Sequence, residues 1–198
     1  MRLEHIPRPV LRKAALIIAD DLAAIVAARK EPEVERVHLQ LLTSGGKQEA
    51  TIFRGGRPRT DRISAALANG IAGSWCELDE GYRLSYCHAG LYTLPALFAD
   101  AEILGLSVAQ MLRAAVLSYE ITARFAGCWK FPQMTLHPHA QTAAIEGTAT
   151  SGIARGCSFQ RASVSEGDVY QRAAPDADGV TNATLRAGLA HDDGSNRP

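Results

Sequence analysis

The sequence predicts a mainly α-helical domain followed by a poorly ordered C-terminal tail. Apolar residues recur at three- and four-residue steps in several segments, a pattern typical of amphipathic helices. After Cys157 long aliphatic side chains almost disappear, and such a composition buries too little apolar surface to offset chain entropy. We therefore expect a folded domain over residues 1–157 and a polar tail, disordered or out of frame, over residues 158–198.

The composition excludes several classes of protein. The chain has 198 residues with 21 basic and 21 acidic side chains, so its formal net charge is zero. Nucleic acids and anionic membranes are bound through a surplus of lysine and arginine, so we expect neither as a partner. No apolar stretch approaches the roughly 18 residues of a membrane span. The four cysteines form no CxxC pair, which favours reduced thiols in a cytoplasmic protein.

The first part of the chain predicts two helices and a short extended segment. The apolar spacing between Val10 and Arg29 predicts a long amphipathic helix with a broad buried face, and Pro9 is tolerated in its first turn. A shorter helix follows up to Leu42 and stops at the Ser-Gly-Gly sequence that comes next. Residues 49–53 are expected to be extended before a glycine-rich turn.

A second long helix is predicted from Asp61 to about Cys76. Its large apolar side chains share one side of the helix: Ile63, Leu67, Ile71 and Trp75. Asn69 and Gly70 are poor residues for a helix interior, and their presence indicates close packing or the approach of another backbone. Residues 77–90 have no clear period and are predicted to form a loop.

Three further helices are predicted in the rest of the domain. The first runs from Leu91 to Leu104 and is closed by a glycine. Ser107 and Gln110 form a capping box for the next, whose core-facing stripe runs from Val108 to Phe125. Residues 126–139 are predicted to form a second loop, and residues 140–155 an alanine- and threonine-rich helix suited to tight packing.

The two polar loops hold the residues that could perform chemistry. The first carries Glu77, Asp79, Glu80, Arg83 and His88, and the second carries Lys130, His137 and His139. Such residues can supply a general base, a general acid and a clamp for a carboxylate. A solvated helix end and hydrogen-bonded structural histidines are the alternative interpretations. The two histidines of the second loop lack a third clear ligand, so we expect no metal site.

Several short pieces, taken in order and with their spacing, resemble a known family. They are Ala65–Gly70, Glu77–Arg83, His88 before Leu94–Leu97, Ala101–Glu102, Ser118–Glu120 with Arg124, and finally His137–Pro138. Together they are similar to the N-terminal helical domain of the MmgE/PrpD family. This family includes 2-methylcitrate dehydratase, cis-aconitate decarboxylase and iminodisuccinate epimerase.

The resemblance implies an activity and site residues. The family's acidic motif falls on Glu77–Glu80, which places Glu77 in the active site with Asp79, and its two histidines fall on His88 and His137. The implied chemistry is proton removal next to a carboxylate of a small polycarboxylate, followed by dehydration, decarboxylation or epimerisation, without a cofactor. Cationic groups, Arg83 and Lys130, are expected to hold the substrate carboxylates.

The sequence also departs from the family pattern. Ala89 stands where proline is usual after the first histidine, and Gln141, Ile145 and Glu146 replace expected small residues. Family members are about twice as long, so a truncated or frame-shifted product and a homodimer formed through exposed apolar surface are both expected. Two alternatives to an enzyme remain: a catalytically inactive helical remnant that lacks the second domain, and an unrelated helical binding module.

Overall fold

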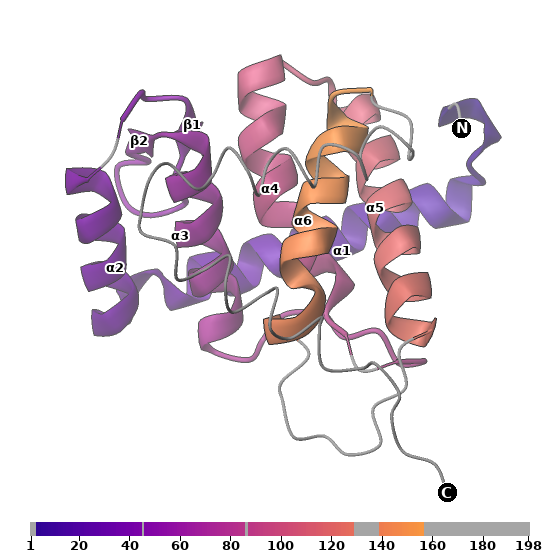
Figure 1. The fold of residues 1–198 in the computed structure, drawn as a ribbon, viewed down its shortest axis with the longest axis horizontal. Coiled ribbons are helices and arrows are strands. Elements are labelled where there is room, and N and C mark those ends of the chain that lie inside the picture. Colours follow the sequence, from indigo (N-terminus) through magenta and orange to yellow (C-terminus); the bar gives the residue numbers. More distant parts are fainter. Residues whose placement is uncertain (1–2, 45, 86, 129–138, 157–198) are drawn as a thin grey trace, which may run out of the picture. The chain divides into compact units, whose positions relative to one another are not determined.

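Helices make up most of the fold, as the sequence predicts. The computed structural model describes residues 3–44, 46–85, 87–128 and 139–156. Within these ranges it contains six α-helices, two short 3-10 helices and one pair of two-residue strands (Figure 1). None of the helices described is long and apolar enough to cross a membrane. The expected helical fold class is confirmed.

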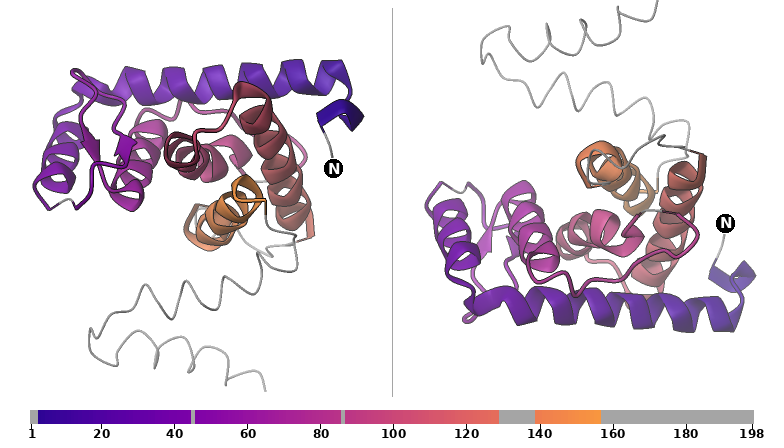
Figure 2. Two further views of the ribbon diagram at one scale, coloured as in Figure 1. Left: turned by 90° about the horizontal axis from the view of Figure 1, so that it is seen from above. Right: turned by 90° about the horizontal axis from the view of Figure 1, so that it is seen from below.

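Helix α1 spans Arg8–Ala27, and a 3-10 turn at Ala28–Lys30 follows it. It lies across one side of the fold and contacts α3, α4 and α5, as Figure 2 shows. A proline in the first turn starts it, because the amide that proline lacks would have no partner there. Its buried face consists of small and branched apolar residues with one exception, the acidic Asp21: Ala14, Ile18, Asp21, Ala24 and Ile25.

The next segment forms helix α2, Pro32–Thr43, and a small antiparallel sheet. Strands β1, Ala50–Thr51, and β2, Arg59–Thr60, pair with Ala50 opposite Thr60. The sheet is attached to the helices through Glu102, which accepts hydrogen bonds from the Thr51 hydroxyl at 2.8 Å and from Arg59 at 2.7 Å. The extended segment expected at residues 49–53 is thus found as one edge of this hairpin.

Helix α3, Arg62–Trp75, begins at Asp61, whose carboxylate accepts hydrogen bonds from the backbone of Ile63 and Ser64. Its buried side is made of small residues: Ala65, Ala68, Asn69, Ala72 and Gly73. The larger apolar stripe faces outward instead, since Ile63 is 70% exposed and Leu67 50%. Small side chains allow neighbouring helices to approach closely. The side of α3 with small residues is therefore buried, and the side with large apolar residues is exposed.

Asn69 has a clear structural task inside α3. Its side chain is buried, accepts a hydrogen bond from the Phe53 amide at 2.9 Å and donates one to the Thr51 carbonyl at 3.0 Å. A buried backbone group needs such a partner. The expectation that another backbone approaches this helix is therefore correct, and the hairpin supplies that backbone.

Helix α4, Ala89–Leu104, lies at the centre of the fold and contacts α3, α5 and α6. It starts two residues earlier than the sequence predicts, so His88 is its N-cap residue, and Gly105 ends it at a φ of 60°. Helix α5, Val108–Cys128, opens with the predicted capping box between Ser107 and Gln110. Val108 itself is 69% exposed and lies outside the core stripe.

Helix α6, His139–Ala154, packs against α4 and α5 and completes this part of the core. Near its C-terminal end, Arg155 donates a hydrogen bond at 2.8 Å to Asp100, a buried residue of α4. The main core cluster draws Ile25 from α1, Leu94 and Leu97 from α4, and Ile153 from α6. The helices around α4 therefore share one apolar core.

The close packing of α3 predicts opposite effects for two glycines three residues apart. A Cβ at Gly73 would lie 2.8 Å from Leu91 Cδ1 and 3.3 Å from Ile25 Cγ1, whereas at Gly70 the nearest atom is 3.8 Å away. Gly73→Ala should lower the free energy of unfolding by about 1–3 kcal/mol. Gly70→Ala should leave it unchanged or raise it by up to about 1 kcal/mol. Urea denaturation measures both, and equal effects would contradict this packing.

Candidate active site

His88 and Asp79 are in direct contact at the N-terminal end of α4. The Nδ1 atom of His88 lies 2.6 Å from Asp79 Oδ2. The Asp79 side chain is 1% exposed and the His88 side chain 26%. A buried carboxylate at one ring nitrogen orients the imidazole, while the partial exposure lets a small molecule reach the ring. Two of the residues predicted to be catalytic are therefore brought together.

Glu80 attaches the same loop to two helices. Its Oε1 accepts a hydrogen bond from the Gly90 amide of α4 at 2.5 Å, and its Oε2 accepts one from the Tyr119 hydroxyl of α5 at 2.8 Å. Tyr82, two residues later, packs edge-to-face against Tyr119 with ring centroids 6.1 Å apart. These contacts fix the backbone on either side of Asp79 and His88.

Asp21 of α1 meets Glu80 over Gly90. The Asp21 side chain is 2% exposed, and within the described residues neither of its oxygens has a hydrogen bond of good geometry. A Cβ at position 90 would collide with Asp21 Oδ2 and lie 3.1 Å from Glu80 Oε1. The two carboxyl groups thus approach one point, and only glycine leaves room for both.

This arrangement perturbs three ionisable groups. Burial raises the pKa of Asp21 to about 8, and the nearby charge of Glu80 adds to the effect. Burial also raises the pKa of Glu80, although its hydrogen bonds from Gly90 and Tyr119 act in the opposite direction. The pKa of Tyr119 is raised by burial and then by the charge of Glu80. At pH 7, therefore, Asp21 carries a proton.

A polar cavity of about 600 Å³ lies between α1 and the loop. Its charged and polar wall comes from both elements and from α5: Lys13, Asp20, Glu80, Arg83 and Tyr119. This volume falls within the range of small-molecule sites. Arg83, predicted to bind a carboxylate, is exposed at this cavity, and Lys13 is a second cation there that the sequence did not suggest.

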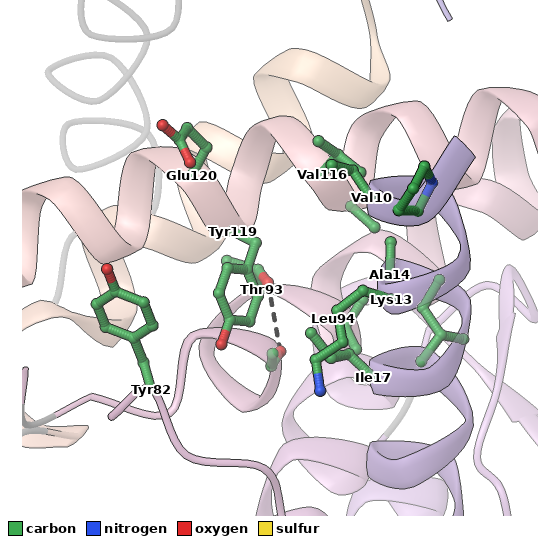
Figure 3. A pocket seen from close by; sticks show the side chains of 14 residues that line it. Val10, Lys13, Ala14, Ile17, Tyr82, Thr93, Leu94, Val116, Tyr119 and Glu120 are labelled. Atoms are coloured by element: carbon green, nitrogen blue, oxygen red, sulfur yellow. Dashed lines mark hydrogen bonds between the residues drawn. The ribbon is translucent and has the colours of Figure 1, made fainter. Parts of the chain in front are cut away.

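A second cavity of about 450 Å³ is lined mostly by apolar residues of α1, α4 and α5. Figure 3 shows Ile17 of α1, Leu94 of α4 and Val116 of α5 around it, with Tyr119 nearby. The two cavities share Lys13, Ile17 and Tyr119 and are therefore neighbours. Tyr119 lies between the apolar and polar spaces and contacts Glu80 from there.

The remaining predicted residues stand apart from this cluster. Glu77 is exposed, directly after the C-terminal end of α3, with a φ of 52° in the left-handed region. Lys130 and His137 lie outside the described residues, as does the side chain of His139. Within the described residues, no group of three or more histidine, cysteine, aspartate or glutamate side chains could hold a metal ion.

Two residues of the cluster were missed by the sequence reasoning. Asp21 lies three residues after Ile18 and four before Ile25, so it occupies the buried stripe of α1. An acid at such a position was a visible signal, because an ionisable group is rarely buried without a partner. Tyr119 was assigned to the core stripe of α5, and nothing in its spacing indicated that its hydroxyl meets Glu80.

One family matches the sequence. The model of the MmgE/PrpD N-terminal domain matches residues 1–165, which is most of the chain. No curated protein matches the chain.

The perturbed Asp21 predicts a specific pH dependence of stability. Its pKa rises from 3.8 to about 8 in the folded chain, so between these values the folded protein keeps a proton that the unfolded chain has lost. Stability should therefore fall as the pH rises through this window, on the order of 1 kcal/mol per pH unit. Asp21→Asn should remove this slope, so the free energy of unfolding of the variant should rise relative to that of the wild type up to pH 8.

The exposed neighbour Asp20 provides the matched control for this comparison. Asp20→Asn makes the same chemical change one residue earlier and should follow the wild-type slope. Urea denaturation between pH 4 and pH 9 gives the three curves. A constant difference between wild type and Asp21→Asn over this range would show that Asp21 is ionised in the folded chain.

Proposed function

The chain belongs to the MmgE/PrpD family, whose N-terminal domain it matches, and on this premise we propose that it acts on a small polycarboxylate. The proposed reaction removes a proton from the carbon next to a carboxylate, and dehydration, decarboxylation or epimerisation uses this step. The protein would then be a lyase or an isomerase. The observation that carries the proposal is the contact between Asp79 and His88 at the start of α4.

In this mechanism His88 is the base. Asp79 holds Nδ1, so Nε2 of the half-buried ring is the atom directed to the substrate proton. The ring takes the proton from the α-carbon, and the electron pair of the broken C–H bond is delocalised into the adjacent carboxylate. In a dehydration, that pair then expels a β-hydroxyl group, which leaves as water after it gains a proton. In an epimerisation, a proton returns to the opposite face of the carbon.

The second acid–base group and part of the anion site are proposed from the family resemblance. His137 would deliver the second proton, and Lys130 would add positive charge to the substrate site. Glu77 is kept in the proposal at the edge of the site, since it follows α3 in the same loop as Asp79. The cavity that Arg83 and Lys13 line supports the binding of a substrate with more than one carboxylate.

We also propose that the protein works in the cytoplasm as a homodimer. The support for assembly is a set of exposed large apolar side chains, among them Ile63 and Leu67 of α3 and Val108 at the start of α5. Exposed apolar surface of this kind favours association. Light scattering of the purified chain gives the mass, and a monomer at all concentrations would contradict the dimer.

The role of His88 predicts a loss of proton exchange. In D₂O, the wild-type chain should exchange the α-hydrogens of di- and tricarboxylates, and NMR should detect the loss of their signal. His88→Gln should slow this exchange by about 100-fold or more, and Asp79→Asn should slow it less. His5→Gln, a change at an exposed histidine far along the chain from the site, should leave it unchanged.

Full exchange by folded His88→Gln would contradict the assignment of the base. A folded wild-type chain that exchanges none of the acids would favour the alternative, a catalytically inactive helical remnant. Circular dichroism shows whether the helices are intact in each case.

The cations of the polar cavity predict an effect on substrate binding. Arg83→Ala and Lys13→Ala should each raise KM by about 10-fold, because each removes one charge from a carboxylate contact. Arg124→Ala removes a charge that pairs with Glu120 on the surface of α5 and should not change KM. A KM unchanged by both cavity variants would place the substrate carboxylates elsewhere.

A further inference from the structure

We propose that Asp21 is a positioning residue: its buried, neutral carboxyl group packs against Gly90 beside Glu80, and this contact from α1 holds the loop which presents Asp79 to His88. The inference rests on the proposed function, because it assigns Asp21 to the same site. It gives a buried residue of α1 a part in holding the Asp79–His88 contact, beside the residues of α1 that line the polar cavity. The contacts around Gly90 carry it.

The loop is held at three points that lie within a short stretch of sequence. Asp79 pairs with His88 before α4, and Glu80 accepts the amide of Gly90 within the first turn of α4. Glu80 also accepts the hydroxyl of Tyr119, which ties the loop to α5. The carboxyl group of Asp21 packs against Gly90 from α1 and adds a further contact near the loop. A displacement of Glu80 would therefore also move Asp79, the adjacent residue, relative to His88.

Two carboxylates that approach one point repel each other when both are ionised, and the burial of Asp21 strengthens this repulsion. Glu80 receives two donors, an amide and a hydroxyl, which stabilise its negative charge. Asp21 is almost fully buried, and the backbone amide of Glu80 only partly offsets the effect of this burial on its pKa. The proton therefore resides on Asp21, whose pKa is raised to about 8.

Other ionisable groups also face this pair and belong to its titration. Asp20 lies beside Asp21 on α1, Asp79 lies next to Glu80 in the loop, and Tyr119 projects from α5. His88, when it is protonated, lowers the pKa of Glu80 from the start of α4. Cys87, a buried thiol, faces Tyr119. Of these, Cys87 is the group whose ordinary titration range, near pH 8–9, overlaps that of Asp21.

The inference predicts that His88 senses the proton on Asp21. The ring signals of His88, assigned by comparison with His88→Gln, are followed by NMR on the full chain between pH 5 and pH 10. Besides the ring's own titration, the wild type should show a second inflection near pH 8, where Asp21 loses its proton. Asp21→Asn should abolish this second inflection, and Asp20→Asn should retain it.

Two further variants make the assignment specific. Cys87→Ser should keep the inflection, because the thiol is not its source. Glu80→Gln should move the inflection to lower pH, because the negative charge that helps to hold the proton on Asp21 is gone. If Asp21→Asn fails to fold, the shift in Glu80→Gln carries the test by itself.

The inference is overturned if the wild type lacks the second inflection, or if the inflection survives in Asp21→Asn or disappears in Cys87→Ser. Its failure and that of the proposed function are distinguishable. An inflection in a chain that exchanges no substrate proton would support the Asp21 link and reject the activity. Substrate exchange without the inflection would support the activity and reject the Asp21 link.

Discussion

Two carboxyl groups, from Asp21 and Glu80, approach one point over Gly90 in the first turn of α4, and that of Asp21 is almost fully buried. A proton on Asp21 lets them pack there, because two negative charges so close together would repel each other strongly. The amide of Gly90 and the hydroxyl of Tyr119 complete the surroundings of Glu80. Through these contacts one short loop is fixed to three helices, and the geometry of Asp79 and His88 depends on it.

Small side chains make this arrangement possible. Gly90 leaves room for both carboxyl groups, and Gly73 allows α3 to approach Leu91 of α4 and Ile25 of α1. The buried side of α3 is otherwise alanine and Asn69. Helices that approach this closely are rigid, since interiors packed at such density leave little room for movement. The site is thus built on helix ends that the core holds in place, and its loop need not be rigid by itself.

The sequence predicted the helices well, because their apolar periodicity and end signals are local. The capping box at Ser107 and the stop at Gly105 are examples. The same reasoning placed Asp79 and His88 in one loop but did not connect them with Asp21, which is 58 residues earlier in the chain than Asp79. It grouped the large apolar side chains on one side of α3 without showing that Ile63 and Leu67 on that side are exposed. Tertiary contacts determine the partners of Asp21 and the side of α3 that is buried, and local periodicity carries no information about such contacts.

A neutral carboxyl group at Asp21 supports the site at neutral pH, and infrared spectroscopy can detect that group. A protonated carboxylic acid has a carbonyl stretching band that ionised carboxylates lack. The wild-type chain should show this band at pH 7 and lose it as the pH rises past about 8. Asp21→Asn should lack it at pH 7, while Asp20→Asn should keep it. If the wild type lacks the band at pH 7, or if Asp21→Asn keeps it, then Asp21 is not the neutral carboxyl group.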